Sequence, residues 1–460
     1  MDWPIREWIE AVGGQLIAGS PETRIAGVST DSRTLSAGQL FVALRGPNFN
    51  GHDFCRDAAA KGAVALMISN PEAIHELPPQ SAAIVAVEDT LAALGKLAAT
   101  YRARFSPIVA ALSGSSGKTT TKEMLRAIAE PHGGLVSQGN LNNRVGVPLS
   151  VFRLEPEHKT AVFELAMNHP SELADLTEIV RPEIVALTNV GSAHLGNFAS
   201  LDDLRNAKAE LILHAPEDAC VVLNADNFGC SWIEERFCAG RDVAKFGMVE
   251  PAHFRAEQIE PVPPLGYRFN LVVPDGRATV TLKTFGRHNI SNALCAAAVA
   301  YILWLDLDPI CAGLETFRPA AMRSEILEIG RVTVIADCYN ANPESVEAAL
   351  DGLVELAGPR RRLFVFADML ELGEHSQMEH RLVGQAVAER GIDLFATTGE
   401  MAGWASWEAA RMCARAGHFE AKEQLVNALV EEIRPGDVIL VKGSRAMALE
   451  EVVQRLKELL

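Results

Sequence analysis

The sequence has 460 residues, of which 48% are hydrophobic and 22% are charged, and its formal net charge is −17. This length predicts roughly two to four domains, and an acidic chain is poorly suited to non-specific binding of nucleic acid or anionic lipid. The eight cysteines form no Cys-x-x-Cys pair and are interpreted as reduced packing residues. The N-terminus has no apolar core, and the longest strongly apolar run covers residues 295–305, so we expect a cytoplasmic protein without integral membrane contact.

Residues 1–105 form the first expected domain. Short runs of β-forming residues precede a helical stretch over 90–105, and Pro107 follows that stretch. The runs cover residues 40–44, 63–68 and 84–87. We therefore expect a domain boundary after residue 105.

Residues 106–318 form the second expected domain, in which strands alternate with helices. The first strand, 108–112, is a continuous apolar run, which is typical of buried parallel strands. Further strands over 160–163 and 184–188 indicate an open parallel sheet. Pro274-Asp275-Gly276 predicts a hairpin, an antiparallel addition to this domain. The two runs that flank this turn are residues 267–273 and 277–284.

A second alternating unit covers residues 319–460 and predicts a third domain. Its expected strands are residues 332–336, 363–367, 394–397 and 438–441. Helical segments between them indicate a doubly wound, Rossmann-like α/β unit. The expected fold class is therefore α/β with three domains, of which the central one has a parallel sheet around a phosphate-binding loop.

That phosphate-binding loop is the strongest chemical motif of the sequence, and it reads Gly114-Ser115-Ser116-Gly117-Lys118-Thr119, followed by Thr120. It lies directly between an apolar strand and a helix, as the Walker A motif does, although Leu112 replaces the first glycine of that motif. Its glycines let backbone N–H groups face phosphates, Lys118 can bridge the outer phosphates, and Thr119 can bind Mg²⁺. The Gly-Lys-Thr sequence in this setting disfavours a mere turn before a capped helix.

Two residues that follow other predicted strands of this domain are candidate metal ligands. Glu164 ends the strand 160–163, and His194 follows the strand 184–188 in a Gly-rich loop. Ligands bind open α/β sheets at the carboxyl ends of the strands, so these side chains and Thr119 would form an Mg²⁺ site. Each of them alone could equally be a solvated loop residue.

Lys208 shares a helix face with Leu201, Leu204 and Leu211, and this face is otherwise apolar. A lysine there must extend its amine to solvent, pair with an acid or be modified. Three polar clusters are further candidate ligand loops. An Asn-rich turn and a helix N-cap are the alternatives for the first two, whereas the third follows a buried strand. The clusters cover residues 140–148, 286–292 and 337–343.

Taken in order, these motifs resemble the Mur ligase family of peptidoglycan synthesis. The resemblance runs from residue 25 to the C-terminus, and it rests on the phosphate loop, residues 164–170, residues 189–194, Lys208 and residues 286–289. Further stretches resemble most the branch of the family that joins D-Ala-D-Ala to UDP-MurNAc-tripeptide. These stretches are residues 30–33 with 41–46 and 51–54, residues 339–343, and residues 368–374 with 441–445.

The resemblance implies an ATP-dependent amide ligase with one domain for the UDP end of the substrate, one for ATP and a mobile Rossmann-like one. The implied Mg²⁺ ligands are Thr119, Glu164 and His194, and Lys208 matches a lysine that the family carbamylates to hold a second Mg²⁺. Lys118, Lys208 and His194 are the implied catalytic residues. Besides the phosphate loop, the implied ATP contacts are Asn289, Arg323 and Asp337. The implied contacts to the UDP-linked substrate are Ser32, Arg33, Asn140, Asn142 and Asn143, and Asn340 and Asn342 are candidates for D-Ala-D-Ala.

The implied mechanism is phosphoryl transfer to the carboxylate of the tripeptide, followed by attack of the amine of D-Ala-D-Ala on the acyl phosphate. We expect a monomer with small-molecule substrates and no nucleic acid partner. Two positions depart from the family pattern: Ala166 and Met322 stand where glycine is usual, which puts the local backbone geometry in doubt.

Alternative functions remain open at this point. Within the superfamily these are the ligases that add the third residue of the peptide and the folylpolyglutamate synthetases, although the chain has no Asp-Asn-Pro-Arg recognition motif. A P-loop switch or motor would be expected to carry an Asp-Glu signature on a second strand, which we do not find. A catalytically dead binding protein is disfavoured because Lys118, Thr119, Glu164, His194 and Lys208 are all present.

Overall fold

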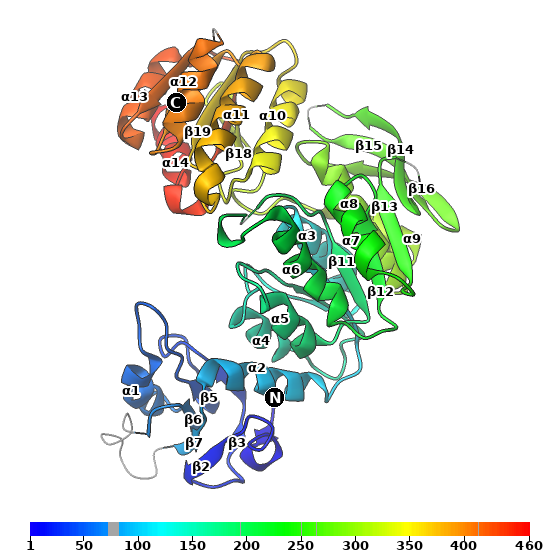
Figure 1. Cartoon of the computed structure of the whole chain (residues 1–460), viewed down its shortest axis with the longest axis vertical. Helices are drawn as coiled ribbons and strands as arrows, with labels where there is room; N and C mark the ends of the chain where they lie inside the picture. The colour runs from blue at the N-terminus through cyan, green and yellow to red at the C-terminus, as the bar shows by residue number, and fades with distance from the viewer. Residues whose placement is uncertain (72–81, 194, 250, 264, 413) are drawn as a thin grey trace.

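Residues 1–71, 82–193, 195–249, 251–263, 265–412 and 414–460 are described in the computed structural model. Three large sheets of five, nine and six strands follow one another along the chain. Each falls within one of the predicted domain ranges, and we use first, central and third domain as names for these ranges. Figure 1 shows the first domain at one end of the molecule, the central domain in the middle and the third domain at the other end.

The first domain is built on a five-stranded sheet in which β2 pairs antiparallel with β7 and the other pairs are parallel. The sheet order is β2 (Gln15–Ala18), β7 (Ala83–Ala86), β6 (Ala65–Ile68), β5 (Gln39–Val42) and β4 (Gly27–Ser29). A separate ribbon pairs β1 (Trp3–Pro4) with β3 (Arg24–Ile25), and the helices are α1 (Cys55–Ala60) and α2 (Thr90–Arg102).

Helix α2 connects the first and central domains. Asp89 caps it, since its carboxylate accepts hydrogen bonds from the backbone N–H groups of Leu91 and Ala92. On the other side the helix packs against α4 (Gly146–Val151) and α5 (Glu172–Val180) of the central domain, as Figure 1 shows. The Tyr101 hydroxyl donates to the carbonyl of Leu154 at 3.0 Å. The two domains therefore share one hydrophobic core across this helix.

The central domain contains the nine-stranded sheet. Its parallel part, in sheet order, is β14 (Phe254–Pro261), β13 (Val243–Gly247), β12 (Cys220–Asn224), β11 (Ile184–Leu187), β8 (Ile108–Ser113), β10 (Thr160–Glu164) and β9 (Gly134–Val136). The predicted hairpin is confirmed, because β15 (Tyr267–Val273) and β16 (Gly276–Leu282) extend the sheet as antiparallel strands beyond β14. The remaining helices are α3 (Lys118–Ala129), α6 (Leu201–Leu213), α7 (Phe228–Phe237), α8 (His288–Ile302) and α9 (Leu307–Thr316).

The third domain has a six-stranded sheet that is parallel except at β17. The order is β17 (Glu325–Ile329), β18 (Val332–Ala336), β22 (Val438–Lys442), β19 (Arg362–Ala367), β20 (Leu394–Thr398) and β21 (Ala416–Phe419). Its helices are α10 (Pro343–Ala357), α11 (Ser376–Glu389), α12 (Ala402–Arg411), α13 (Lys422–Glu432) and α14 (Glu450–Leu459). All four strands predicted for this domain are confirmed.

Helix α10 attaches the third domain to the central one. Phe285 of the central domain belongs to the hydrophobic core of the third. A Cβ on Gly352 of α10 would lie 2.6 Å from the Phe285 ring, so the helix approaches closely because it has a glycine there. The Tyr267 hydroxyl donates to Glu355 at 2.7 Å beside this contact. The docked arrangement therefore has both an apolar and a polar component.

Two expectations from composition can also be compared with the structure. Within the described ranges, no helix combines the length and the apolar character needed to cross a bilayer. The seven cysteines in these ranges are all free, as predicted, and Cys413 lies outside the described residues.

Candidate active site

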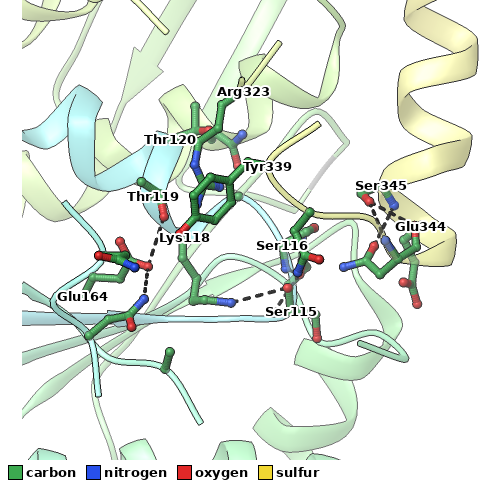
Figure 2. Close-up of a pocket in the computed structure, with 18 of the residues that line it drawn as sticks. Ser115, Ser116, Lys118, Thr119, Thr120, Glu164, Arg323, Tyr339, Glu344 and Ser345 are labelled. Atoms are coloured by element: carbon green, nitrogen blue, oxygen red, sulfur yellow. Dashed lines mark hydrogen bonds between the residues drawn. The ribbon is translucent and has the colours of Figure 1, made fainter. Parts of the chain in front are cut away.

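A pocket of about 690 Å³ lies where the central domain meets the third. Its volume is typical of a small-molecule site. It brings together predicted residues from six separate stretches of the chain, namely Ser115, Ser116, Gly117, Lys118, Thr119, Thr120, Asn140, Asn142, Asn143, Glu164, Asn289, Arg323, Asp337, Asn340 and Asn342. Figure 2 shows Arg323 and Tyr339 of the third domain next to Lys118 of the phosphate loop, with Glu164 at one end of the view and Glu344 at the other.

The phosphate loop connects β8 to α3 in the predicted strand-to-helix context. Gly117 has φ 78° and lies at the N-cap of α3, where a Cβ would be 2.2 Å from the Asn292 side chain. Gly114 has φ 147°, and a Cβ there would be 2.0 Å from the Thr188 hydroxyl. Both positions therefore require glycine. The free N–H groups at the start of α3 make this end of the pocket an anion site.

Lys118 lies along the phosphate loop, and its amine donates to the carbonyl of Gly114 at 2.7 Å. Burial lowers the pKa of this amine; the Glu164 carboxylate opposes that shift, while the charge of Arg323 adds to it. Bound phosphates would place negative charge beside Lys118 and Arg323 and would compensate these two positive charges. The loop can therefore recognise a polyphosphate group by charge as well as by its backbone.

Asn189, which follows β11, holds the phosphate loop in shape. Its amide oxygen accepts from the backbone N–H groups of Ser115 (3.1 Å) and Ser116 (2.9 Å), and its amide nitrogen donates to the Ser116 hydroxyl (2.8 Å). Sequence reasoning gave Asn189 no role. The sequence feature that could have indicated this role is an amide side chain directly after the predicted strand 184–188. The carboxyl end of that strand lies at the same edge of the sheet as the phosphate loop.

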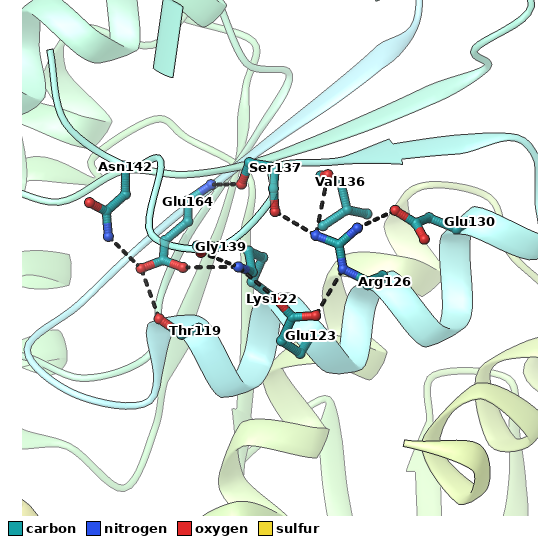
Figure 3. A network of polar contacts seen from close by, with 10 residues as sticks. All are labelled: Thr119, Lys122, Glu123, Arg126, Glu130, Val136, Ser137, Gly139, Asn142 and Glu164. Atoms are coloured by element: carbon teal, nitrogen blue, oxygen red, sulfur yellow. Dashed lines mark hydrogen bonds and ion pairs between the residues drawn. The ribbon is translucent and has the colours of Figure 1, made fainter. Parts of the chain in front are cut away.

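Glu164 ends β10 as predicted and is 1% exposed. Its Oε1 accepts from the Thr119 hydroxyl at 3.1 Å and from the Asn142 amide at 2.8 Å (Figure 3). Its Oε2 has no hydrogen-bond partner among the described residues, although the amine of Lys122 lies 3.8 Å away. A buried carboxylate oxygen with free acceptor capacity beside a hydroxyl fits a Mg²⁺ ligand set.

The third predicted metal ligand, His194, lies outside the described residues. Within the described part of the chain, His, Cys, Asp and Glu form no group of three that could hold a metal ion. Thr119 and Glu164 are therefore the two members of the predicted Mg²⁺ set that the structure brings together.

Lys208 lies on the inner face of α6 and is 1% exposed, so the alternative of an amine extended to solvent is wrong. Its amine donates to the carbonyl of Gly114 at 3.3 Å, which places it behind the phosphate loop. Burial lowers its pKa well below the usual value, and the charge of Lys118 lowers it further. The lowered pKa favours the uncharged amine, which is the nucleophilic form that carbamylation requires.

The third domain contributes a basic and aromatic side to the pocket. The Arg323 guanidinium lies 3.8 Å from the centre of the Tyr339 ring, and both face the phosphate loop (Figure 2). Asp337 accepts from the backbone N–H of Ser324 at 2.9 Å and from the amine of Lys442 at 2.5 Å. Arg323 and Asp337, the ATP contacts predicted in this domain, therefore line the pocket, and Lys442 lines it beside them.

The two departures from the family pattern differ in their backbone. Met322 has φ 62°, a left-handed conformation in which glycine costs least, and Ser324 repeats it at 56°. Ala166 is not among the positive-φ residues, and its N–H donates to the carbonyl of Asn142 at 2.8 Å. The doubt about backbone geometry therefore applies to Met322 and not to Ala166.

Several predicted amides are engaged in local structure. The Asn289 amide nitrogen donates to the carbonyl of Phe285 and its oxygen accepts from Asn292, both at 2.8 Å. Asn143 accepts from the N–H of Gly146, and Asn342 caps α10. The Asn143 contact agrees with the turn alternative for residues 140–148, whereas no side chain caps α8, so the N-cap alternative for residues 286–292 is wrong. Of the predicted pair in the third domain, Asn340 is the exposed one.

His288, next to Asn289, also lines the pocket. Its Nδ1 has no hydrogen-bond partner among the described residues. Burial lowers the pKa of this ring to about 4, an effect that the charge of Asp337 opposes and that of Lys442 supports. The imidazole is therefore neutral near pH 7. It can donate a hydrogen bond to an uncharged ring of a bound ligand or accept one from it.

Ser32 and Arg33 do not line this pocket. They lie in the first domain, where the carbonyl of Ser32 accepts from Lys61 and the exposed Arg33 pairs with Asp31. The structure therefore separates these two predicted substrate contacts from the other candidate residues. A long substrate would have to extend from one group to the other.

Comparison with known proteins covers all three domains. Residues 24–102 match the model of the Mur ligase family, catalytic domain, residues 112–300 the Mur ligase middle domain, and residues 322–445 the Mur ligase, glutamate ligase domain. The UDP-N-acetylmuramoyl-tripeptide–D-alanyl-D-alanine ligase of Escherichia coli K12 is 40% identical over 94% of this chain and 93% of its own length. The ligase of the same name from Bacillus subtilis is 30% identical over 95% and 94%.

Solved structures agree with these matches. A crystal structure of MurF from Acinetobacter baumannii has a TM-score of 0.91 at 32% identity, covering 100% of this chain and 99% of that one. MurF from Thermotoga maritima, solved in complex with ADP, has a TM-score of 0.82 at 26% identity, covering 94% and 97%. The site geometry, the domain order and the matches over nearly the whole length lead to one conclusion: the chain belongs to the Mur ligase family.

Proposed function

We propose that this protein is the ATP-dependent ligase that joins D-Ala-D-Ala to UDP-MurNAc-tripeptide and releases ADP and phosphate. The observation that carries the proposal is the pocket in which the phosphate loop and Glu164 face Arg323 and Asp337 of the third domain. Relatives named for this reaction match the chain over nearly its whole length, and one is 40% identical. The substrate assignment rests on those relatives, and the reaction type rests on the pocket.

In the first step, an oxygen of the terminal carboxylate of the tripeptide attacks the γ-phosphorus of ATP, and the bond to the β-phosphate oxygen breaks. ADP leaves with that electron pair, and an acyl phosphate forms. Lys118 and the N–H groups at the start of α3 stabilise the negative charge on the transferring group. Arg323 adds a further positive charge from the third domain.

In the second step, the uncharged amine of D-Ala-D-Ala attacks the acyl carbon. A tetrahedral intermediate forms, the amine loses a proton to solvent or a nearby base, and phosphate leaves as the amide forms. Both steps depend mainly on positioning, so docking of the third domain is expected to control the rate.

We further propose that the protein binds two Mg²⁺ ions. Thr119 and Glu164 would hold one together with His194, and Mg²⁺ there would supply positive charge that stabilises the transferring phosphoryl group. The second would be held by a carbamate on Lys208, which forms when the neutral amine adds to CO₂ and loses one proton. The free Oε2 of Glu164 and the lowered pKa of Lys208 support this assignment.

The proposed cellular state is a cytoplasmic monomer. ATP and nucleotide-linked precursors are available in the cytoplasm. Sedimentation of the purified protein with and without ATP would measure the oligomeric state.

Phosphate release from ATP tests the proposed reaction. We expect release with UDP-MurNAc-tripeptide and Mg²⁺ to require D-Ala-D-Ala, and the product mass to increase by the dipeptide residue. Release that requires a single amino acid or a folate instead would assign the protein to another branch of the superfamily. Absence of release with every pair would contradict the ligase assignment.

Glu164→Gln tests the proposed metal site. We expect kcat to fall by about 10²-fold or more, because the amide cannot replace the charge of a Mg²⁺ ligand. The Mg²⁺ concentration for half-maximal rate should rise at the same time. Glu130→Gln, at an exposed position beyond the end of α3, is the control and should leave both values unchanged. Equal Mg²⁺ dependence in Glu164→Gln and the unmodified protein would contradict the metal role.

A further inference from the structure

The loop between β11 and α6 contacts the third domain at two places. At its start, Glu344 Oε1 accepts hydrogen bonds from the backbone N–H (2.6 Å) and the hydroxyl (2.9 Å) of Ser192. At its end, the N–H of Gly196 donates to the backbone carbonyl of Glu371 at 3.0 Å. The third domain therefore holds this central-domain loop on both sides.

The fit between Glu344 and the loop is close. Glu344 belongs to the first turn of α10, two residues after the capping residue Asn342, so its backbone position is fixed by the helix. A Cβ on Gly191 would lie 2.4 Å from the Glu344 carboxylate. The contact thus depends on a glycine in the loop and on a carboxylate at a defined position of α10.

The same loop is hydrogen-bonded to the phosphate loop. The N–H of Gly191 donates to the Ser115 hydroxyl oxygen at 2.9 Å, and the N–H of Ser115 donates to Asn189. Two consecutive residues, Gly191 and Ser192, therefore connect Glu344 of the third domain to Ser115 of the phosphate loop. Figure 2 shows Glu344 at the start of α10, on the side of the pocket where Ser115 and Ser116 lie.

We propose that Glu344 is a positioning residue that couples docking of the third domain to the geometry of the phosphate loop. In the docked arrangement it fixes Ser192 and Gly191, and these fix Ser115 and the N–H groups next to it. Without docking, the loop loses this anchor and the phosphate loop loses one of its supports. Phosphoryl transfer is then fast only when the third domain, with Arg323, is in place.

Other carboxylates of the pocket do not have this arrangement. Glu164 bonds to Thr119 and Asn142 within the central domain, and Asp337 bonds to Lys442 within the third. Glu344 instead bonds across the boundary, and its described partners are neutral groups of the loop. Its role is therefore that of an acceptor at a fixed position rather than one half of an ion pair.

Three variants test the proposal by steady-state phosphate release with all three substrates. Glu344→Ala is expected to lower kcat by about 10-fold or more, since a charge-assisted pair of hydrogen bonds is lost. Glu344→Gln keeps an acceptor oxygen and should stay within about threefold of the unmodified protein. Glu347→Ala, at an exposed position on the same helix, is the matched control and should be unchanged.

A double-mutant cycle with Ser115→Ala separates coupling from a local effect. If the contact acts through Ser115, the loss from Glu344→Ala should largely disappear in the Ser115→Ala background. Additive losses would overturn the coupling, as would an unchanged kcat in Glu344→Ala. A raised KM for D-Ala-D-Ala with unchanged kcat, or an equal loss in Glu344→Gln, would also overturn it and assign the carboxylate to the incoming amine. Unchanged melting temperatures would show that these variants fold.

Discussion

Lys208→Met is expected to abolish ligase activity and, at the same time, to stabilise the protein. Lys208 is 1% exposed, and the hydrogen bond of its amine to the carbonyl of Gly114 is 3.3 Å long. A polar group buried with so little compensation costs about 1–3 kcal/mol, and methionine fills a similar volume without that cost. Urea denaturation should therefore show a higher free energy of unfolding, while phosphate release should fall below about 1% of the unmodified rate.

The pH dependence of this stability gain follows from the pKa of Lys208. Because burial lowers the folded-state pKa, the unfolded chain binds more protons than the folded one between that pKa and the ordinary lysine value. The stability of the unmodified protein therefore rises with pH in this range. The difference in free energy of unfolding between Lys208→Met and the unmodified protein should be largest at the acidic end of this range. It should decrease as the pH approaches about 10.4.

Lys96→Met is the matched control for this experiment. Lys96 is exposed on α2, so its replacement should change the free energy of unfolding by less than about 0.5 kcal/mol and leave activity intact. A Lys208→Met protein that is less stable than the unmodified one would mean that Lys208 is well paired in the fold. Full activity in that variant would remove Lys208 from the site.

Stability and activity have opposite requirements at Lys208 because the site is built for a ligand. A buried amine beside a second lysine is costly in the unliganded protein, and the charge of Lys118 increases that cost. The same arrangement would become favourable once phosphates and the proposed carbamate supply negative charge. Strained or unsatisfied groups are commonly found where binding supplies the missing partner.

The strands that carry the site could be predicted because their sequences are unambiguous. The strands β8, β10 and β11 each contain an uninterrupted apolar run of at least three residues, and chemically useful residues lie at or just after the end of each of them. The sequence pattern predicts neither β9, which has only three residues, nor the strands β12 and β13. The order of the strands, with β8 between β10 and β11, depends on pairing between distant segments, which local pattern does not determine.

The residues that hold the site in shape could not be predicted for a related reason. Lys118 and Glu164 are recognisable because a motif or a strand end identifies them. Asn189, Lys122 and Glu344 each contact partners that are far away in the sequence, such as Ser115 for Asn189, although Lys122 also pairs with the adjacent Glu123. Their residue types are ordinary on helices and in loops, so only the folded arrangement distinguishes them from solvated polar residues.

Lys122→Met is expected to have the opposite effect on stability from Lys208→Met, with a loss of roughly 3 kcal/mol or more. Lys122 is 0% exposed and, like Lys208, lies inside the central domain. In contrast to Lys208, its amine is well paired (Figure 3). Its amine donates to the carbonyl of Gly139 at 2.6 Å, forms an ion pair with Glu123 at 2.7 Å and lies 3.8 Å from Glu164 Oε2. Methionine would leave these oxygens without the cation that compensates their burial.

Acid titration distinguishes lost pairing from lost packing in Lys122→Met. Burial alone would raise the pKa of Glu123, but hydrogen bonds and charges from Lys122 and Arg126 outweigh it, and the pKa is lowered. This contribution to stability is present above the unfolded pKa of about 4.3 and is lost as the pH falls through the lower folded value. The difference in free energy of unfolding between Lys122→Met and the unmodified protein should therefore have its full size at pH 7 and decrease below a pH of about 4. A difference that does not depend on pH would indicate that Lys122 stabilises the fold by packing, and a stabilised variant would contradict the paired role altogether.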